Sequence, residues 1–273
     1  MNTLCLPPSF PIYRESQQKI YIPRFFGKDT FGEADDNKLE PGNDISLNFA
    51  GGLRDYQQKI VDAYLNQQDA HGCGGLLEIP CGRGKTVIAL NLISQLKVKT
   101  LVVVHKSFLL NQWVERIEQF LPGARIGKIQ GQMIDIDNKD IVIGMLQSLS
   151  MKEYPSNMFS SFGFTIVDEC HHISSEVFSR SLQKIVTCNV LGLSATMQRK
   201  DGLTKVFKMF LGPVAYKEER RSNDPVLVKA IQYSSNDTEF SETEYDYRGN
   251  PAYSQMIVKL CNFNPRSEFI LNI

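Results

Sequence analysis

The sequence predicts an α/β fold in which a parallel β-sheet is covered by helices on both faces. Three observations predict it: short, continuous apolar runs that alternate with helical periodicity, a glycine-rich turn between a strand and a helix, and two carboxylates directly after another strand. Continuous apolar strands indicate a sheet that is buried on both sides, because a half-exposed strand would alternate apolar and polar residues. The chain of 273 residues is long enough for about two domains.

The expected elements follow in order. The first 48 residues are rich in Pro, Asp, Asn and Gly, and only residues 19–26 are expected to be extended there. Helical spacing then predicts helices over residues 53–65, 85–96 and 107–120, the last with Ser107 as its N-cap. Apolar runs predict strands over residues 75–79, 101–105, 140–143, 164–167 and 189–193, and a further strand is expected over residues 226–233. We therefore expect an N-terminal extension and linker (1–48), an α/β domain (49–233), and a linker with the start of another domain (234–273).

Composition and charge exclude several classes of protein. The 30 Lys and Arg residues balance 30 Asp and Glu residues, so any nucleic-acid site must be a local basic surface. No apolar run approaches the ~18–20 residues that cross a bilayer, and we expect neither a membrane partner nor a signal peptide. The six cysteines form no C-x-x-C pair, which favours a reducing, intracellular compartment over a disulfide framework. Cys170, His171 and His172 lack a second cluster that would complete a zinc site.

A candidate phosphate-binding loop occupies residues 80–86, Pro-Cys-Gly-Arg-Gly-Lys-Thr, between an apolar strand and a helix. Its glycines let backbone N–H groups approach phosphate oxygens, and the helix N-terminus adds positive potential. Lys85 would reach the β- and γ-phosphates, and the Thr86 hydroxyl would coordinate Mg²⁺. The general motif has Gly where this sequence has Ile79. On this segment alone, a glycine-rich turn without a ligand remains the alternative.

Two carboxylates, Asp168 and Glu169, directly follow the apolar run 164–167. At the carboxyl edge of a parallel sheet, one carboxylate can hold Mg²⁺ and the other can deprotonate an attacking water. Such a pair in isolation is usually a solvated loop, but its place in the same α/β alternation as the phosphate loop favours a catalytic site. Ser194 and Thr196 end a further strand, where their hydroxyls either cap the next helix or bond the carboxylates or His171.

Taken in order and spacing, Gly-Arg-Gly-Lys-Thr, Asp-Glu-Cys-His and Ser-Ala-Thr resemble motifs I, II and III of DExH-type superfamily 2 helicases. The preceding Pro-Cys-Gly is similar to the XPB-like branch, which includes repair translocases and transcript-release helicases of large DNA viruses. The resemblance implies a RecA-like lobe over residues 50–217 that uses ATP and Mg²⁺. It implies catalytic roles for Glu169 as the base, Lys85 and His171, Mg²⁺ binding by Thr86 and Asp168, and coupling by Ser194 and Thr196.

Other segments carry the same resemblance. Residues 53–57 resemble the adenine-reading Q motif, with Gln57 as the base reader and Arg54 nearby. Together with the phosphate loop, the resemblance implies a nucleotide-binding set of Arg54, Gln57, Gly82, Arg83, Gly84, Lys85 and Thr86. Residues 103–106 resemble motif Ia, and residues 197–202 resemble a basic extension of motif III. Residues 145–149 resemble the family's strand-end motif Thr-x-Gln-Ser, in which Met145 replaces the Thr. The implied nucleic-acid contacts are His105, Lys106, Gln147, Ser148 and Arg199. Trp113 is expected in the core rather than stacked on a base.

The resemblance implies an ATP-dependent helicase or translocase that makes sequence-independent backbone contacts to DNA, in transcription or repair; RNA is the alternative. A nucleotide-gated binding module without turnover is a second class, and a plain NTPase is a third, against which the Gln57 segment argues. Such helicases hydrolyse ATP between two lobes, and the second lobe supplies an arginine finger. Residues 251–273 resemble the opening of that second lobe. We therefore expect a monomeric piece of a longer helicase, poorly active without the downstream lobe and, if viral, located in host cytoplasm or virion.

Overall fold

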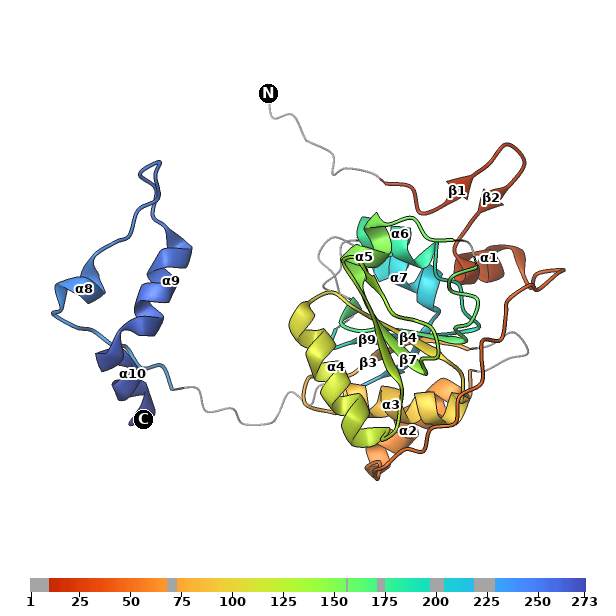
Figure 1. Cartoon of the computed structure of the whole chain (residues 1–273), viewed down its shortest axis with the longest axis horizontal. Coiled ribbons are helices and arrows are strands. Elements are labelled where there is room, and N and C mark those ends of the chain that lie inside the picture. The colour runs from red at the N-terminus through yellow and green to blue at the C-terminus, as the bar shows by residue number, and fades with distance from the viewer. Residues whose placement is uncertain (1–9, 68–72, 156, 171–174, 197–203, 219–228) are drawn as a thin grey trace. The chain divides into compact units, whose positions relative to one another are not determined.

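The computed structural model describes residues 10–67, 73–155, 157–170, 175–196, 204–218 and 229–273. The chain divides into two compact units, residues 1–220 and 221–273. In the larger unit, a central sheet lies between two layers of helices, as Figure 1 shows. Within the described ranges, no helix is both long and apolar enough to cross a membrane.

The larger unit is built on an eight-stranded sheet of order β10-β3-β9-β8-β4-β7-β5-β6. All neighbours pair in parallel except β5 and β6, which are antiparallel, and this confirms the predicted α/β class. The strands are β3 (Gly74–Glu78), β4 (Thr100–Val104), β5 (Ile126–Gln130), β6 (Met133–Ile134), β7 (Ile141–Met145), β8 (Phe164–Val167), β9 (Asn189–Ser194) and β10 (Val214–Lys217). Every residue of the central strands β4, β8 and β9 is buried, as their continuous apolar runs predict.

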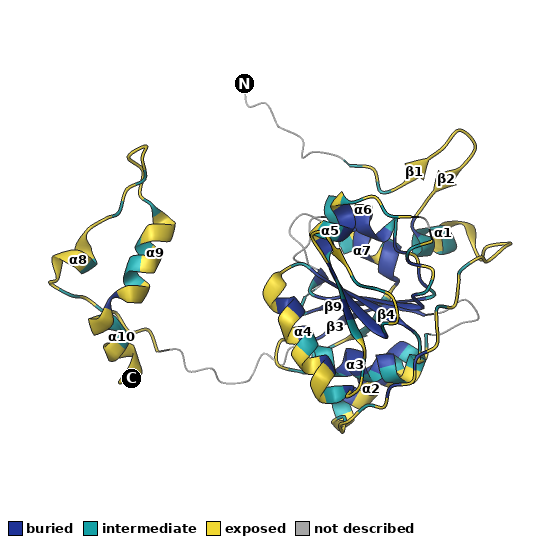
Figure 2. Cartoon of the chain, in the orientation of Figure 1, coloured by how far each residue is buried: buried dark blue, intermediate teal, exposed yellow. Residues whose placement is uncertain are grey.

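Helices cover both faces of the sheet. One layer is formed by α2 (Asp55–Leu65), α3 (Lys85–Leu96) and α4 (Ser107–Phe120), and the other by α5 (Leu146–Met151), α6 (Ser175–Leu182) and α7 (Thr204–Leu211). Each layer has its own apolar core against the sheet, and the outer helix faces are exposed (Figure 2). The carboxyl ends of the strands are thereby left at one edge, where open α/β sheets bind ligands.

The N-terminal extension differs from the expected extended segment 19–26. It contains β1 (Arg14–Glu15) and β2 (Ile20–Tyr21), but residues 24–31 form the helix α1 (Arg24–Phe31), which begins after Pro23. Tertiary contacts account for the helix: the Arg24 guanidinium donates to the carbonyl oxygens of Thr187 and Cys188 at 3.1 and 2.9 Å. The Phe25 ring lies over Gly74, where an added Cβ would lie 1.9 Å from the ring.

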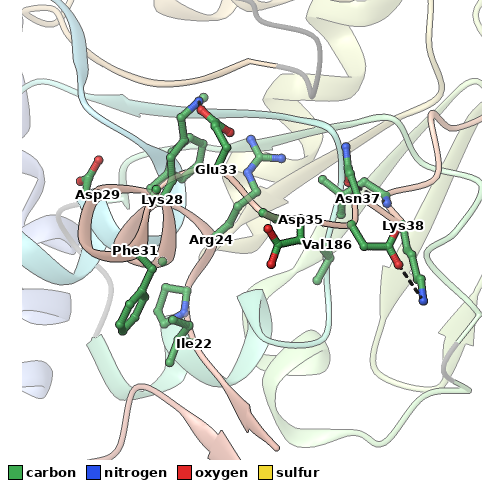
Figure 3. A pocket seen from close by; sticks show the side chains of 18 of the residues that line it. Ile22, Arg24, Lys28, Asp29, Phe31, Glu33, Asp35, Asn37, Lys38 and Val186 are labelled. Carbon is green, nitrogen blue, oxygen red and sulfur yellow. Dashed lines mark hydrogen bonds and ion pairs between the residues drawn. The ribbon is translucent and has the colours of Figure 1, made fainter.

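A cavity of about 890 Å³ opens between α1, the acidic segment that follows it, and the amino ends of β3, β9 and β10. Figure 3 shows charged side chains of both signs around it, among them Arg24, Lys28 and Asp35. Since Gly74 begins β3, this cavity lies at the sheet edge opposite the phosphate loop. It is therefore separate from the edge at which the predicted site residues meet.

The smaller unit contains α8 (Thr238–Ser241), α9 (Tyr253–Asn262) and α10 (Asn264–Leu271). The prediction of a strand over residues 226–233 is wrong for residues 229–233, which form no strand. Residues 226–228 lie outside the described ranges. The Tyr233 ring instead packs against Phe240 and Phe269, with ring centroids 5.4 and 5.2 Å apart. These contacts place its apolar side chain among helices of the smaller unit rather than in a sheet.

Candidate active site at the carboxyl edge of the sheet

The phosphate loop leaves the carboxyl end of β3 and enters α3 at Lys85. Gly84 has a φ of +82°, and a Cβ at this position would lie 2.4 Å from the Gln57 Nε2 atom, so the loop requires glycine there. Ile79 is fully buried in the core beneath the loop. The residue that departs from the general motif is therefore a packing residue of this chain.

The structure brings together Lys85, which follows β3, and Glu169, which follows β8. Strand β9 lies between these two strands. The Lys85 Nζ atom lies 3.2 Å from Glu169 Oε1 and donates to the Ile79 carbonyl oxygen at 3.4 Å. Both side chains are largely buried, with exposed fractions of 10% and 20%. Glu169 has a left-handed φ of +48°, which is uncommon for a residue with a Cβ and is concentrated at functional sites.

Asp168 is held from both sides of its carboxylate. Its Oδ2 atom accepts a hydrogen bond from Trp113 Nε1 at 2.8 Å, and its Oδ1 atom accepts one from the Glu169 backbone N–H at 2.9 Å. Burial raises the pKa of Asp168 above its ordinary value, and the hydrogen bond from Trp113 acts in the opposite direction. The sequence placed Trp113 in the core, which is correct, but gave no signal of this polar contact.

The donor chemistry at this edge fits Mg²⁺. An ionised carboxylate has about four lone-pair sites, so two bonds leave Asp168 with further acceptor capacity. Mg²⁺ in phosphate-binding sites is usually held through one or two carboxylates and the substrate's phosphates, not by a protein cage. No cluster of three or more His, Cys, Asp and Glu side chains suited to a metal occurs in the described part of the chain. Thr86, half-buried in the first turn of α3, offers the hydroxyl oxygen.

The segment before α2 is bonded directly to the phosphate loop. Gln57 accepts from the Arg54 backbone N–H at 3.0 Å and donates from Nε2 to the Arg83 carbonyl oxygen at 3.1 Å. The Arg83 guanidinium lies 4.2 Å from the centre of the Tyr56 ring and forms an ion pair with Glu218. The sequence missed Tyr56 and Glu218; the latter follows β10, a strand that it did not predict.

The structure describes some of the remaining motif residues of this edge. Ser194 ends β9, between β3 and β8, and its hydroxyl donates to the Thr196 carbonyl oxygen. The Thr196 backbone N–H donates back to Ser194 Oγ at 3.2 Å, which closes a turn. Their coupling role stays a prediction. His171 and Arg199, two other predicted site residues, lie outside the described residues.

Four of the five predicted nucleic-acid residues, all but Arg199, lie at the carboxyl ends of β4 and β7, which pair with each other. Gln147 donates from Nε2 to the carbonyl oxygen of His105 at 3.0 Å. Ser148 Oγ accepts from the Gly131 backbone N–H at 2.9 Å, which ties this corner to the turn between β5 and β6. Lys106 is exposed beside them. One half of the sheet edge thus carries the phosphate-loop residues and the other half this group.

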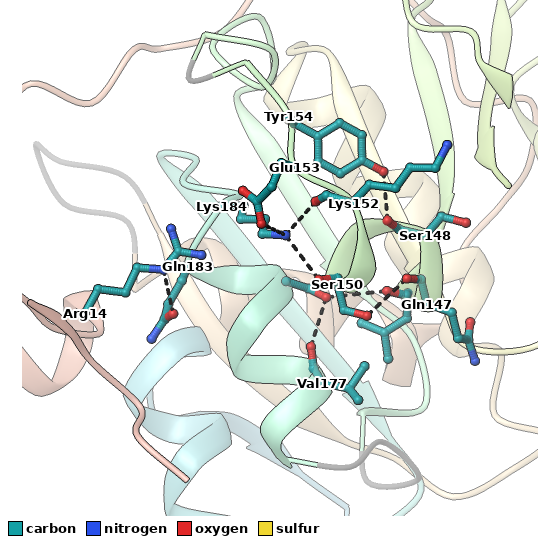
Figure 4. A network of polar contacts seen from close by, with 12 residues as sticks. Arg14, Gln147, Ser148, Ser150, Lys152, Glu153, Tyr154, Val177, Gln183 and Lys184 are labelled. Atoms are coloured by element: carbon teal, nitrogen blue, oxygen red, sulfur yellow. Dashed lines mark hydrogen bonds and ion pairs between the residues drawn. The ribbon is translucent and has the colours of Figure 1, made fainter. Parts of the chain in front are cut away.

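A polar network fixes the short helix α5, which carries Gln147 and Ser148 (Figure 4). Tyr154 donates from its hydroxyl to the Ser148 carbonyl oxygen at 2.9 Å. Lys184, which follows α6, donates to the carbonyl oxygens of Ser150 and Lys152 at 3.1 and 2.6 Å. The two Lys184 bonds engage carbonyl groups at and just after the end of α5, where a helix leaves its last carbonyl groups without partners of its own. The helix is thereby anchored to the segment that follows α6.

Comparison with known proteins shows which family the chain matches. The family described as "Type III restriction enzyme, res subunit" matches residues 51–199, which include the phosphate loop, both carboxylates and the Ser194–Thr196 turn. Among solved structures, the chain is similar to the UvsW helicase from bacteriophage T4, with a TM-score of 0.55, 20% identity, and 74% of this chain and 81% of that one covered. It is also similar to the Sulfolobus solfataricus SWI2/SNF2 ATPase core in complex with dsDNA, with a TM-score of 0.52, 19% identity, and 65% and 38% covered. At such identities these two likenesses show the fold alone.

Relatives in sequence confirm the resemblance stated above. A protein of Acanthamoeba polyphaga mimivirus named as an ATP-dependent RNA helicase, L396, is 35% identical over 268 residues, which are 96% of this chain and 51% of that protein. The DNA 3'-5' translocase XPB2 of Sulfurisphaera tokodaii is 34% identical over 169 residues, 61% of this chain and 36% of the relative. The chain thus spans about half the length of the mimivirus relative. It belongs to the family described as "Type III restriction enzyme, res subunit", and it carries the first, N-terminal lobe of a superfamily 2 helicase.

Proposed function

We propose that this chain is the MgATP-binding lobe of a helicase or translocase that couples ATP hydrolysis to movement on DNA. The observation that carries the proposal is the 3.2 Å contact between Lys85 Nζ and Glu169 Oε1. It brings the phosphate loop that follows β3 into contact with a candidate general base that follows β8, and catalysis of phosphoryl transfer depends on such positioning. In this proposal Lys85 binds the β- and γ-phosphates, Thr86 and Asp168 hold Mg²⁺, and Glu169 activates water.

Two features support a nucleic-acid motor rather than a plain NTPase. The Gln57 segment is bonded to the phosphate loop, and the His105–Gln147 corner lies further along the same sheet edge. The XPB-like resemblance and the name of the archaeal relative favour DNA as the substrate, and the name of the mimivirus relative makes RNA the second candidate. A binding module without turnover would share the nucleotide site, so hydrolysis is what separates these classes.

The nucleotide site is tested by Lys85→Ala. We expect the affinity for MgATP to fall about 10- to 100-fold, because a charge-assisted hydrogen bond contributes about 1.5–3 kcal/mol. Isothermal calorimetry on the 273-residue chain measures this loss, and circular dichroism checks the fold. Lys59→Ala, which removes an exposed lysine from α2, is the matched control and should leave affinity unchanged. An unaltered affinity in a folded Lys85→Ala protein would remove the phosphate-loop assignment.

Gln57 is expected to contribute to adenine selection as well as to loop geometry. Among the described contacts, the Gln57 amide oxygen and nitrogen make one hydrogen bond each, which leaves a second acceptor site and a second N–H for a base. Gln57→Ala should therefore abolish a preference for ATP over GTP and CTP, and should also lower affinity for all three through the freed Arg83 loop. Competition binding with the three nucleotides measures both effects.

The neighbouring Gln58→Ala is the control, since the Gln58 amide bonds only Asp62 on the exposed face of α2 among the described contacts. It should change neither affinity nor preference. Equal binding of the three nucleotides by the unaltered chain, with a uniform loss in Gln57→Ala, would assign the amide to the loop alone.

A further inference from the structure

The buried hydrogen bond between Trp113 and Asp168 joins a helix of one layer to the candidate metal site. Trp113 lies on α4, is 1% exposed, and packs in the core between α4 and the sheet. Its Nε1 atom nevertheless reaches the Oδ2 atom of Asp168, 55 positions further along the chain, at 2.8 Å. The indole N–H thus donates to a carboxylate at the carboxyl edge of the sheet. An indole with a purely structural role could equally donate to a backbone carbonyl group.

The contact restricts how the carboxylate can turn. The backbone N–H of Glu169 occupies Oδ1 and the indole N–H occupies Oδ2, from opposite sides of the group. Rotation about the bond that carries the carboxylate would break both hydrogen bonds in a site that is 6% exposed, where water is a poor substitute. The two hydrogen bonds therefore hold the Asp168 carboxylate, and with it the remaining lone pairs, in one orientation.

From this geometry we propose that Trp113 is a positioning residue for the metal site: its indole N–H holds Asp168 in the orientation that binds Mg²⁺ with ATP. The proposal rests on the proposed function and adds a residue to it. Loss of an outer partner of a metal ligand commonly lowers metal affinity 10- to 100-fold, and this sets the expected size of the effect. The indole acts only through Asp168 and does not touch the nucleotide.

Trp113→Phe tests the proposal because it keeps an aromatic ring in the core and removes the N–H donor. We expect the Mg²⁺ concentration for half-maximal ATP binding to rise about tenfold or more, while the weak binding of ATP in EDTA stays unchanged. Ile117→Val, on the same helix and fully buried, is the matched control for a loosened core and should leave the Mg²⁺ dependence unaltered.

A double-mutant cycle separates positioning from packing. Once Asp168→Asn has removed the ligand charge, adding Trp113→Phe should have no further effect on Mg²⁺-dependent binding. Losses that add in the double variant, or a Mg²⁺ dependence within twofold of the unaltered chain in folded Trp113→Phe, would overturn the inference. In those cases the unaltered chain still binds MgATP, so the proposed function survives; an unaltered chain without Mg²⁺-dependent ATP binding overturns both.

A second measurement needs no substitution of Trp113. Trp113 is the single tryptophan of the chain, so its fluorescence reports directly on the atom pair in question. Emission should change when Mg²⁺ is added to the ATP-bound chain, and the change should be absent in Asp168→Asn. A response of equal size in Asp168→Asn would show that the indole does not sense the metal through this carboxylate, and would overturn the proposal.

Discussion

ATP turnover should fall roughly 10²–10⁴-fold when Glu169 is replaced by Gln in a chain that also carries a second lobe, because a positioned general base contributes about that factor. The amide keeps the shape of the side chain but cannot take a proton from water. Nucleotide affinity should stay near its original value or rise slightly, since the carboxylate that lies 3.2 Å from Lys85 is replaced by a neutral amide, which competes less with the phosphates for the ammonium group. Steady-state hydrolysis and calorimetry on the same protein measure the two quantities.

The matched control is Glu176→Gln, which alters a half-exposed glutamate of α6 that pairs with Arg180. It should change neither turnover nor affinity, because surface ion pairs contribute little. Loss of turnover without loss of binding assigns Glu169 to the transition state. If turnover persists in Glu169→Gln, the base lies elsewhere and the contact between Glu169 and Lys85 is structural.

The central strands and the positions of the site residues could be predicted from the sequence because both follow from the burial and direction of parallel strands. A strand buried on two faces must be apolar throughout, and such runs predicted β3, β4, β7, β8 and β9. Parallel strands end at a common edge, so polar residues after these runs had to gather there. Lys85, Asp168 and Glu169 do so in the structure.

Other elements gave a weaker pattern or depend on tertiary contacts. The hairpin of β5 and β6 and the edge strand β10 are only partly buried, so they lack continuous apolar runs. Helix α1 depends on Arg24 and Phe25 docking against residues far along the chain. The helix α7 was missed although Val206, Phe207 and Phe210 recur at helical spacing, a signal that the sequence did contain.

The side-chain contacts within the site could not be predicted, for a related reason. Periodicity places a residue on a face or at an edge, but it does not say which atoms meet there. Trp113 was correctly assigned to the core on its apolar neighbours, yet its N–H points to Asp168. Arg83 was assigned to nucleotide on its place in the loop, and the structure adds Tyr56 and Glu218 as its partners.

The largest expected effect comes from a second lobe. The described lobe supplies the phosphate loop, the candidate metal carboxylate and the candidate base, whereas the resemblance places the arginine that stabilises transferring charge on the other lobe. Such an arginine contributes about 10³–10⁵ in rate in related phosphoryl-transfer enzymes. We therefore expect residues 1–273 alone to bind MgATP weakly, to hydrolyse it barely above background, and to unwind no duplex.

Fusing a second lobe downstream should raise ATP turnover by about 10³-fold or more, and DNA should stimulate it more than RNA. Half of the nucleic-acid track neutralises fewer phosphates, so the single lobe should bind DNA modestly and its affinity should be sensitive to salt. The fused chain makes more phosphate contacts and should bind more tightly, with a steeper dependence on salt. Turnover of both proteins, measured with and without duplex DNA and RNA over a range of salt, tests this. Vigorous DNA-stimulated hydrolysis by the single lobe would contradict the two-lobe mechanism, unless it rises with the square of protein concentration, as assembly of the active unit from two copies requires.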